Sequence, residues 1–310
     1  MHPDPKHAAK QTAALTAVYL IWGSSFMFTK IGVTHLPAAL FSGVRFILAG
    51  VILSLLARFW RGDAWPTLGR DWRHLLIMAV FMVLCSAGLN AWALQFITSG
   101  ESALLNTTAA LWIAGFGSFG VRGHPLSRLA VLGLILGVLG TALTLSPHFS
   151  LDSTSTVPYL GALIACLAWS IGTMYYRHID TQVGSMMFIG MQMLIGGGLQ
   201  FALGCSFGQL AEWTFETPGM ISLAYLSLFS SCLAYTAYGW LTRNSTPAII
   251  GTYSYVNPAL AAFLGWLLLN EELLPIQFAG MFVTIVGVAL VTFMGTTPRN
   301  DKSLEEPSSP

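Results

Sequence analysis

The chain consists of apolar runs of about 20 residues, separated by short polar turns, prolines and charges. About 20 apolar residues in helical form cross a bilayer core, since a helix satisfies its own backbone polar groups there. The sequence therefore predicts an all-α membrane protein with ten transmembrane helices. Their expected ranges are 12–33, 37–58, 74–97, 101–121, 128–146, 157–177, 183–204, 218–241, 247–270 and 274–294.

The composition argues against a soluble domain and against nucleic-acid binding. Hydrophobic residues make up 55% of the 310 residues and charged residues 9%, which is too little polar surface to cover a soluble domain. The net charge is +1, and the basic residues form no cluster that would neutralise phosphates. We predict a multi-pass inner-membrane protein that contacts the lipid bilayer and a small-molecule solute, with no cofactor, metal or nucleic acid. The sequence leaves a homodimer open.

The basic residues predict the orientation in the membrane, because cytoplasmic loops retain Lys and Arg. If both termini are cytoplasmic, twelve of the fourteen basic residues fall on that side: Lys6, Lys10, Arg58, Arg61, Arg70, Arg73, Arg122, Arg128, Arg177, Arg243, Arg299 and Lys302. We expect a cytoplasmic N-terminal tail at 1–11. The Pro-, Ser- and charge-rich segment 298–310 is expected to be a disordered cytoplasmic tail.

A shift of 147 residues aligns uncommon residues of the two halves. The matched pairs include Trp22 with Trp169, Met27 with Met174, Lys30 with Arg177, Gly43 with Gly190, Gly50 with Gly197, Cys85 with Cys232, Gly133 with Gly280, and Gly140 with Gly287. Each half, 12–146 and 157–294, holds five predicted helices, so two copies would insert with opposite orientation. Such inverted repeats place a solute site near the midplane and favour alternating access. The alternative is a coincidental register between two apolar halves.

Several ordered motifs carry a family resemblance. They are IWGSSFMFTKIG at 21–32, LPAALFSGVRFILAG at 36–50, SALLNTTAALWIAGFGSF at 102–119, GALIACLAWSIGTMYYR at 161–177 and YSYVNPALAAFLGWLLLNEEL at 253–273. With these motifs, nearly the whole chain resembles the EamA-type members of the drug/metabolite transporter superfamily. The resemblance implies ten helices in two inverted five-helix repeats, and export of small metabolites, often amino acids, or of drugs. One departure is Gln192, which stands where the first repeat has Arg45, so a charge-based site would be one-sided.

Arg45 is the candidate with the strongest physical argument, because it lies inside the second apolar run. An arginine at the centre of a membrane helix costs roughly 2.5–3.5 kcal/mol on insertion scales and usually faces protein, water or a solute. One interpretation is that its side chain reaches the interface or nearby carbonyls. A second is that it anchors an anionic group such as an amino-acid carboxylate. A third is that it pairs with Glu101.

Other candidate solute-binding residues are polar or aromatic side chains within predicted helices. Pro258 predicts a kink in the ninth helix near residues 253–256. The kink would free a backbone carbonyl from its helical hydrogen bond, which is tolerated where the helix lines a cavity. Interhelical packing and hydrogen bonding are the alternative roles for all of these residues. The candidates besides Arg45 are Trp22, Asn90, Asn106, Trp169, Gln192, Tyr235, Tyr253 and Asn257.

These observations favour a secondary transporter that exports small amphipathic metabolites, with amino acids as the expected substrates. The alternative is a broad-specificity efflux protein for apolar cationic drugs, although an intramembrane arginine argues against cations. A minor alternative is an intramembrane enzyme, but no nucleophile–base or metal-ligand pattern falls at membrane depth, so no catalytic residue is proposed. The predicted helices also hold no central Asp or Glu that would indicate a coupling ion.

Overall fold

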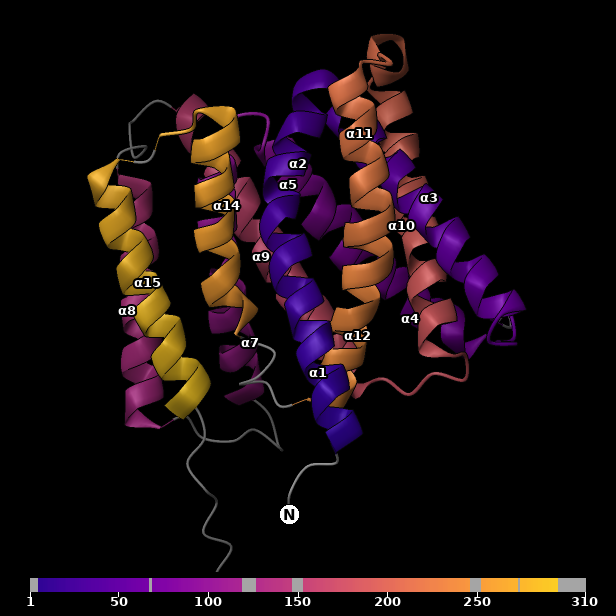
Figure 1. The fold of residues 1–310 in the computed structure, drawn as a ribbon, viewed down its shortest axis with the longest axis horizontal. Helices are drawn as coiled ribbons and strands as arrows, with labels where there is room; N and C mark the ends of the chain where they lie inside the picture. The colour runs from indigo at the N-terminus through magenta and orange to yellow at the C-terminus, as the bar shows by residue number, and fades with distance from the viewer. Residues whose placement is uncertain are drawn as a thin grey trace, which may run out of the picture.

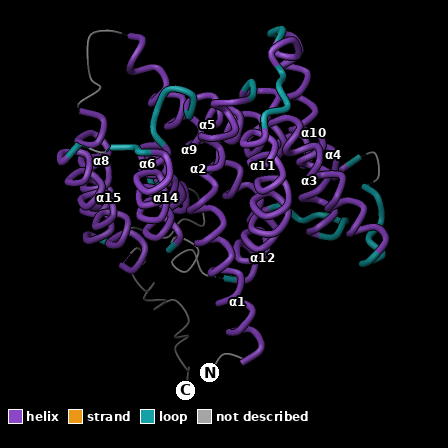
Figure 2. The backbone as a smooth tube through the Cα atoms, turned by 45° about the horizontal axis from the view of Figure 1, so that its top comes forward, coloured by secondary structure: helices purple, strands orange, loops and turns teal. Residues whose placement is uncertain are grey.

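The computed structural model describes residues 5–66, 69–118, 127–146, 153–245, 252–272 and 274–294. Within these ranges the chain is helical and contains no strand, and short loops join the helices (Figure 2). Helices in the first half are α1 Pro5–Ala17, the π-helical η1 Val18–Trp22, α2 Gly23–His35, α3 Ala38–Phe59, α4 Arg70–Met78, the π-helical η2 Ala79–Ala87, α5 Gly88–Ala93, α6 Ser99–Asn106, α7 Thr108–Ser118 and α8 Arg128–Leu145.

The second half has a similar order of elements. They are α9 Ser153–His178, α10 Ser185–Ser206, the short 3-10 turn η4 Gln209–Glu212, α11 Thr217–Tyr225, the π-helical η5 Leu226–Ala234, α12 Tyr235–Asn244, α14 Tyr253–Leu269 and α15 Pro275–Met294. In the described ranges, six helical stretches are long and apolar enough to cross a membrane: 6–35, 38–59, 71–93, 156–178, 185–206 and 217–244. The described part of the chain is therefore all-helical, as expected for a membrane protein.

Several boundaries differ from those expected from the sequence. The first helix begins at Pro5, so residues 5–11, expected in the N-terminal tail, are helical. The fourth predicted helix is divided at Thr107, whose hydroxyl donates to the Leu104 carbonyl at 2.7 Å and competes with helical hydrogen bonding. The helix that holds Pro258 begins at Tyr253; residues 246–251 and the predicted tail 298–310 lie outside the described residues.

Glycines allow α3 and α10 to pack with their backbones in contact. These two helices lie side by side in Figure 1. A Cβ atom added at Gly43 would lie 2.6 Å from the backbone nitrogen of Phe201, and one added at Gly197 would lie 2.8 Å from that of Ile47. Small residues permit this close approach between membrane helices. Arg45 lies between Gly43 and Gly50 on α3, within the length of this contact.

A second close pair, α8 and α15, packs in the same way at the edge of the bundle (Figure 1). A Cβ atom at Gly140 would lie 2.7 Å from the Gly280 carbonyl oxygen, and one at Gly287 would lie 2.6 Å from that of Gly133. Thr284 also contacts Gly140. The remaining helices form the larger group that surrounds the interior described next.

The π-helical segments η2 and η5 interrupt two long helices at related positions. Ala79 is separated from Leu226, and Ala87 from Ala234, by the same 147 residues that align the two halves. Stretches of π-helix are rare and frequently lie at functional sites. Both segments contribute side chains to the central cavity.

Candidate functional site

A cavity of about 110 Å³ lies among the helices of both halves. Its polar and charged lining residues come from α2, α3, α5, α6, η2, η5 and α14, and its aromatic ones from η1, α9, α12 and α14 as well. The lining residues are Trp22, Ser25, Phe26, Thr29, Arg45, Phe46, Met82, Ser86, Ala87, Asn90, Asn106, Trp169, Ser230, Tyr235, Tyr253 and Asn257. Eight of the nine binding residues expected from the sequence are therefore brought together in one place; Gln192 is not among them.

Arg45 is held in the cavity wall by hydroxyl groups of η5. Its Nε donates to Ser231 Oγ at 2.9 Å and its Nη2 to Ser230 Oγ at 3.1 Å. The guanidinium also lies 4.8 Å from the ring centre of Phe46. In the described part of the chain no carboxylate pairs with Arg45, so the suggested pairing with Glu101 is wrong. Neutral oxygens orient this cation but leave its charge uncompensated.

Glu101 and Lys30 form hydrogen bonds at helix ends and do not contribute to the cavity lining. Glu101 completes a capping box with Thr98 at the start of α6 and accepts a hydrogen bond from Tyr159 Oη at 3.0 Å. Lys30 Nζ donates to the carbonyl oxygens of Leu94 at 2.8 Å and Ile97 at 3.0 Å. These carbonyls follow α5, so the lysine satisfies helix-end acceptors and does not line the cavity.

Four aromatic rings that line the cavity, together with Tyr238, which does not line it, form an aromatic wall with Trp22 at its centre. Its ring centre lies 5.4 Å from that of Trp169, 6.2 Å from Tyr235, 4.9 Å from Tyr238 and 5.9 Å from Tyr253. Trp22 Nε1 donates to the Ser230 carbonyl oxygen at 3.3 Å, which fixes the indole beside the serine that binds Arg45. The wall is a rigid apolar surface next to a cation.

The three asparagines of the cavity differ in what they offer to a solute. Asn90 Oδ1 already accepts a hydrogen bond from Ser102 Oγ at 2.7 Å. Asn106 lies at the end of α6, next to the interruption at Thr107. Asn257 is only 4% exposed, and its Oδ1 has no hydrogen-bond partner among the residues that the structure describes. An unpaired buried acceptor is uncommon and calls for a donor.

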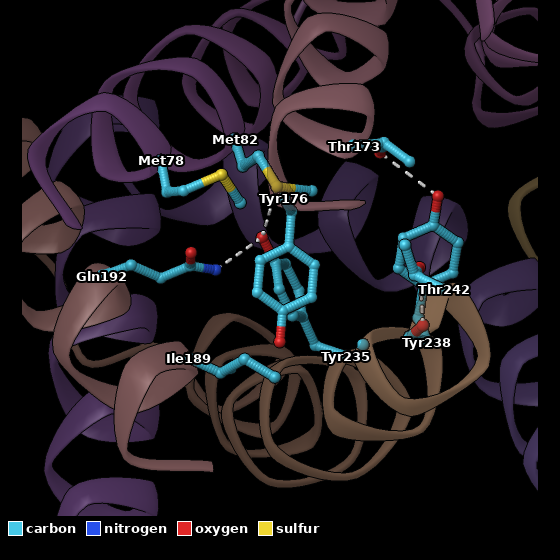
Figure 3. A pocket seen from close by; sticks show the side chains of 10 residues that line it. Met78, Met82, Thr173, Tyr176, Ile189, Gln192, Tyr235, Tyr238 and Thr242 are labelled. Carbon is cyan, nitrogen blue, oxygen red and sulfur yellow. Dashed lines mark hydrogen bonds between the residues drawn. The ribbon is translucent and has the colours of Figure 1, made fainter. Parts of the chain in front are cut away.

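Gln192 lies beyond Tyr235 and lines a second, much smaller void (Figure 3). Its Nε2 donates to Tyr235 Oη at 3.0 Å, and this hydroxyl donates to Met82 Sδ at 3.5 Å. Tyr235 and Met82 line both spaces. The void measures about 10 Å³, room for about one water.

Sequence reasoning missed the small hydroxyl residues of the cavity. Ser25, Thr29, Ser86 and Ser230 all line it. Ser25 and Thr29 are spaced four residues apart and so share one face of α2, a pattern that could have been noticed. No such spacing in the sequence indicates Ser230, because residues of the π-helical η5 point in different directions from those of an α-helix.

Comparisons with known proteins agree on a transporter architecture. The EamA-like transporter family matches the chain twice, over residues 12–146 and 156–293. The Escherichia coli K12 protein named as the uncharacterized inner membrane transporter YedA is 31% identical over 280 residues, which cover 90% of this chain and 89% of that protein. The Bacillus subtilis protein named as the uncharacterized transporter YvbV is 23% identical, covering 92% of this chain and 93% of its own.

A solved crystal structure has the same fold. It superposes with a TM-score of 0.67 and covers 92% of this chain and 97% of its own, at 20% sequence identity. Similarity at this level of identity concerns the fold alone.

Proposed function

Since this chain belongs to the EamA-like transporter family, we propose that it is a secondary transporter of the inner membrane. It exports small metabolites that carry a carboxylate, amino acids above all, by alternating access. The proposal includes no catalytic step and no cofactor. Transport itself is the shared property of the family and of the named relatives.

The observation that carries the substrate proposal is the uncompensated charge of Arg45 in a cavity walled by aromatic rings. Its described partners are two serine hydroxyls, and a guanidinium grips a carboxylate through two parallel hydrogen bonds. The rings of Trp22 and Trp169 supply an apolar surface for a side chain. A cationic drug would be repelled by Arg45, which makes broad cation efflux the weaker alternative.

We propose that ten spans form two inverted repeats, 12–146 and 157–294. Contacts between the halves support this arrangement, because they occur as they would around a pseudo-twofold axis. Gly43 of α3 packs near Gly197 of α10, while Gly50 packs near Gly190. The 147-residue shift relates Gly43 to Gly190 and Gly50 to Gly197, so each glycine contacts the counterpart of the other one. Trp22 and Trp169, matched by the same shift, touch each other.

Alternating access would require the layer around Tyr235 to open. The small void beyond it is lined by Met78, Tyr176 and Thr242, which lie near the basic residues at the proposed cytoplasmic end. The space there has room for about one water, so in this proposal a solute enters from the cytoplasm only after α12 and its neighbours separate. Hydrogen bonds at Tyr235 would be exchanged in that step.

Both termini are proposed to be cytoplasmic. In support, α1 begins and α15 ends at the same end of the bundle (Figure 1). In a variant lacking native cysteines, Leu210→Cys, in the exposed turn η4, should react with a membrane-impermeant maleimide outside intact cells. Arg61→Cys should react only after permeabilisation. The reverse labelling pattern would reject this orientation.

Efflux from liposomes tests the transport proposal. Liposomes that contain the purified protein, loaded with labelled amino acids or with a labelled lipophilic cation, should release one or more amino acids faster than protein-free liposomes. The cation should leave at the protein-free rate, because Arg45 repels it. Protein-dependent release of the cation without any amino acid would instead support drug efflux.

A further inference from the structure

We propose that the central cavity holds a second polar subsite, opposite in character to Arg45, which accepts the ammonium group of an amino acid. Its members are Asn257 on α14 and the hydroxyl oxygens of Ser25 and Thr29 on α2. The inference rests on the proposed function and adds to it how amino acids are distinguished from plain carboxylates.

Asn257 provides the first argument. Its side chain is buried and lines the cavity, and its Oδ1 accepts no hydrogen bond from the described part of the chain. Leaving a buried acceptor unpaired is unfavourable, so such atoms in native proteins call for an explanation. The adjacent Pro258 lacks a backbone N–H and cannot offer one to nearby acceptors. A donor brought by the solute would satisfy the amide oxygen.

The hydroxyls of α2 provide the second argument. Ser25 Oγ donates to the Trp22 carbonyl oxygen at 2.7 Å, and Thr29 Oγ1 donates to the Ser25 carbonyl oxygen at 2.7 Å. A hydroxyl has one proton to donate, so both oxygens have only lone pairs left for other partners. Both residues line the cavity. This face of α2 is therefore an acceptor surface.

Helices α2 and α14 are packed together, which places these acceptors on one side of the cavity. A Cβ atom added at Gly23 of α2 would lie 2.7 Å from Cδ2 of Leu260 on α14, so the two helices are in close contact there. Phe26 of α2 and Ala261 of α14 share one buried cluster. Asn257 lies about one turn before Leu260 and Ala261 on α14, and Ser25 lies between Gly23 and Phe26 on α2.

Donors come from other elements of the cavity wall. Arg45 on α3 has no acceptor atom, and Ser230 Oγ accepts from it, which leaves the hydroxyl proton of that serine available. Arg45 and Ser230 thus supply donors from α3 and η5, and α2 and α14 supply the acceptors Ser25 Oγ, Thr29 Oγ1 and Asn257 Oδ1. On α14 the Tyr253 hydroxyl and the Asn257 amide nitrogen can donate as well. An α-amino acid carries both complementary groups on neighbouring atoms. A plain carboxylate would satisfy only the donors.

Among the described lining residues none is Asp or Glu. The ammonium would therefore be held by neutral oxygens, helped by the faces of Trp22 and Trp169, toward which cations are attracted. This arrangement suits a zwitterion without net charge. An amine that lacks a carboxylate would still meet the repulsion of Arg45.

Ligand-induced thermal stabilisation of the purified protein tests the proposal. The probes are three pairs that differ only in the ammonium group: leucine with 4-methylpentanoate, phenylalanine with 3-phenylpropanoate, and alanine with propanoate. A ligand that binds the folded state stabilises it in proportion to the logarithm of its concentration over Kd. In at least one pair the amino acid should bind about tenfold or more tightly than its partner, as expected for a hydrogen bond to a charged group.

Asn257→Leu should lower that preference by about tenfold, with little change for the plain carboxylate, because only the ammonium loses its acceptor. The matched control is Asn90→Leu, in the same cavity; the oxygen of Asn90 already serves Ser102, so both members of a pair should be affected alike. If Asn257→Leu does not fold, Asn257→Asp is measured in its place. Aspartate has the same shape as asparagine and carries a negative charge, so this variant should strengthen binding of leucine methyl ester, which keeps the ammonium group.

Equal binding of both members in every pair by the unmodified protein would overturn the ammonium subsite. The carboxylate proposal would stand in that case if Arg45→Gln weakened both members together. An unchanged preference in Asn257→Leu, or in Asn257→Asp no gain for the ester, would also overturn the subsite. Failure of all six compounds to bind would reject both proposals.

Discussion

Arg45→Gln should weaken binding of carboxylate solutes by about 30-fold or more and reduce their transport in the same proportion. Truncating one partner of a buried, hydrogen-bonded charge pair costs about 2–5 kcal/mol, and each 1.4 kcal/mol is a factor of ten in affinity. Glutamine is chosen because it is the residue at the matched position 192 of the second half. The measurements are the Kd from ligand-induced stabilisation and the initial rate of uptake into liposomes.

Arg45→Lys separates charge from geometry. Lysine keeps the positive charge but lacks the planar fork that grips a carboxylate at two points. We expect an affinity between those of the native protein and Arg45→Gln. Ser231→Ala removes a hydroxyl that orients the guanidinium through Nε and should give a smaller loss. Transport by Arg45→Gln at the native rate would show that Arg45 has no role in the solute site.

Gly197→Ala should destabilise the folded protein strongly, because the added methyl has no room at the α3–α10 contact. The new Cβ would lie 2.8 Å from Ile47 N, 2.9 Å from Gly43 O and 3.0 Å from Phe46 C. All three are backbone atoms, so relief requires the two helices to separate. Overpacking of this kind typically costs about 1–3 kcal/mol and occasionally more. The midpoint of thermal unfolding in detergent should fall by roughly 5 °C.

The neighbouring Gly198 supplies the matched control. A Cβ atom there meets nothing within 4 Å, on the same helix and one residue away. Gly198→Ala should leave the midpoint unchanged or raise it slightly, because alanine is favoured over glycine in a helix by up to about 1 kcal/mol. Equal midpoints for the two variants would contradict the close backbone packing of α3 and α10.

The positions of the helices could be predicted from the sequence, because membrane helices are recognised by the length of their apolar runs. The interruptions within helices could not be predicted. Thr107 divides the fourth helix without a proline or glycine beside it, and η2 and η5 read as ordinary apolar segments. Hydrogen bonds from hydroxyls to the backbone and packing against neighbours decide such features, and neither appears in a pattern of hydrophobicity.

The candidate site was partly predictable for a related reason. A costly residue such as Arg45 stands out in an apolar helix, and deep aromatic and amide groups mark the side that faces protein. Gln192 was expected among the solute-binding residues as the counterpart of Arg45 in the repeat, but it lines the smaller void beyond Tyr235. The halves are alike in sequence spacing without being alike in conformation here: η1 is π-helical, whereas the matched residues of α9 are α-helical.

The most direct test of the central claim, that Arg45 binds the carboxylate of a transported solute, is counterflow in liposomes that contain the purified protein. The probes are the amino acid that these liposomes release fastest and its methyl ester, which keeps the ammonium and side chain but loses the carboxylate charge. We predict that an excess of the unlabelled amino acid inside drives accumulation of the labelled amino acid and not of the labelled ester. Accumulation of the ester at an equal rate would contradict the account.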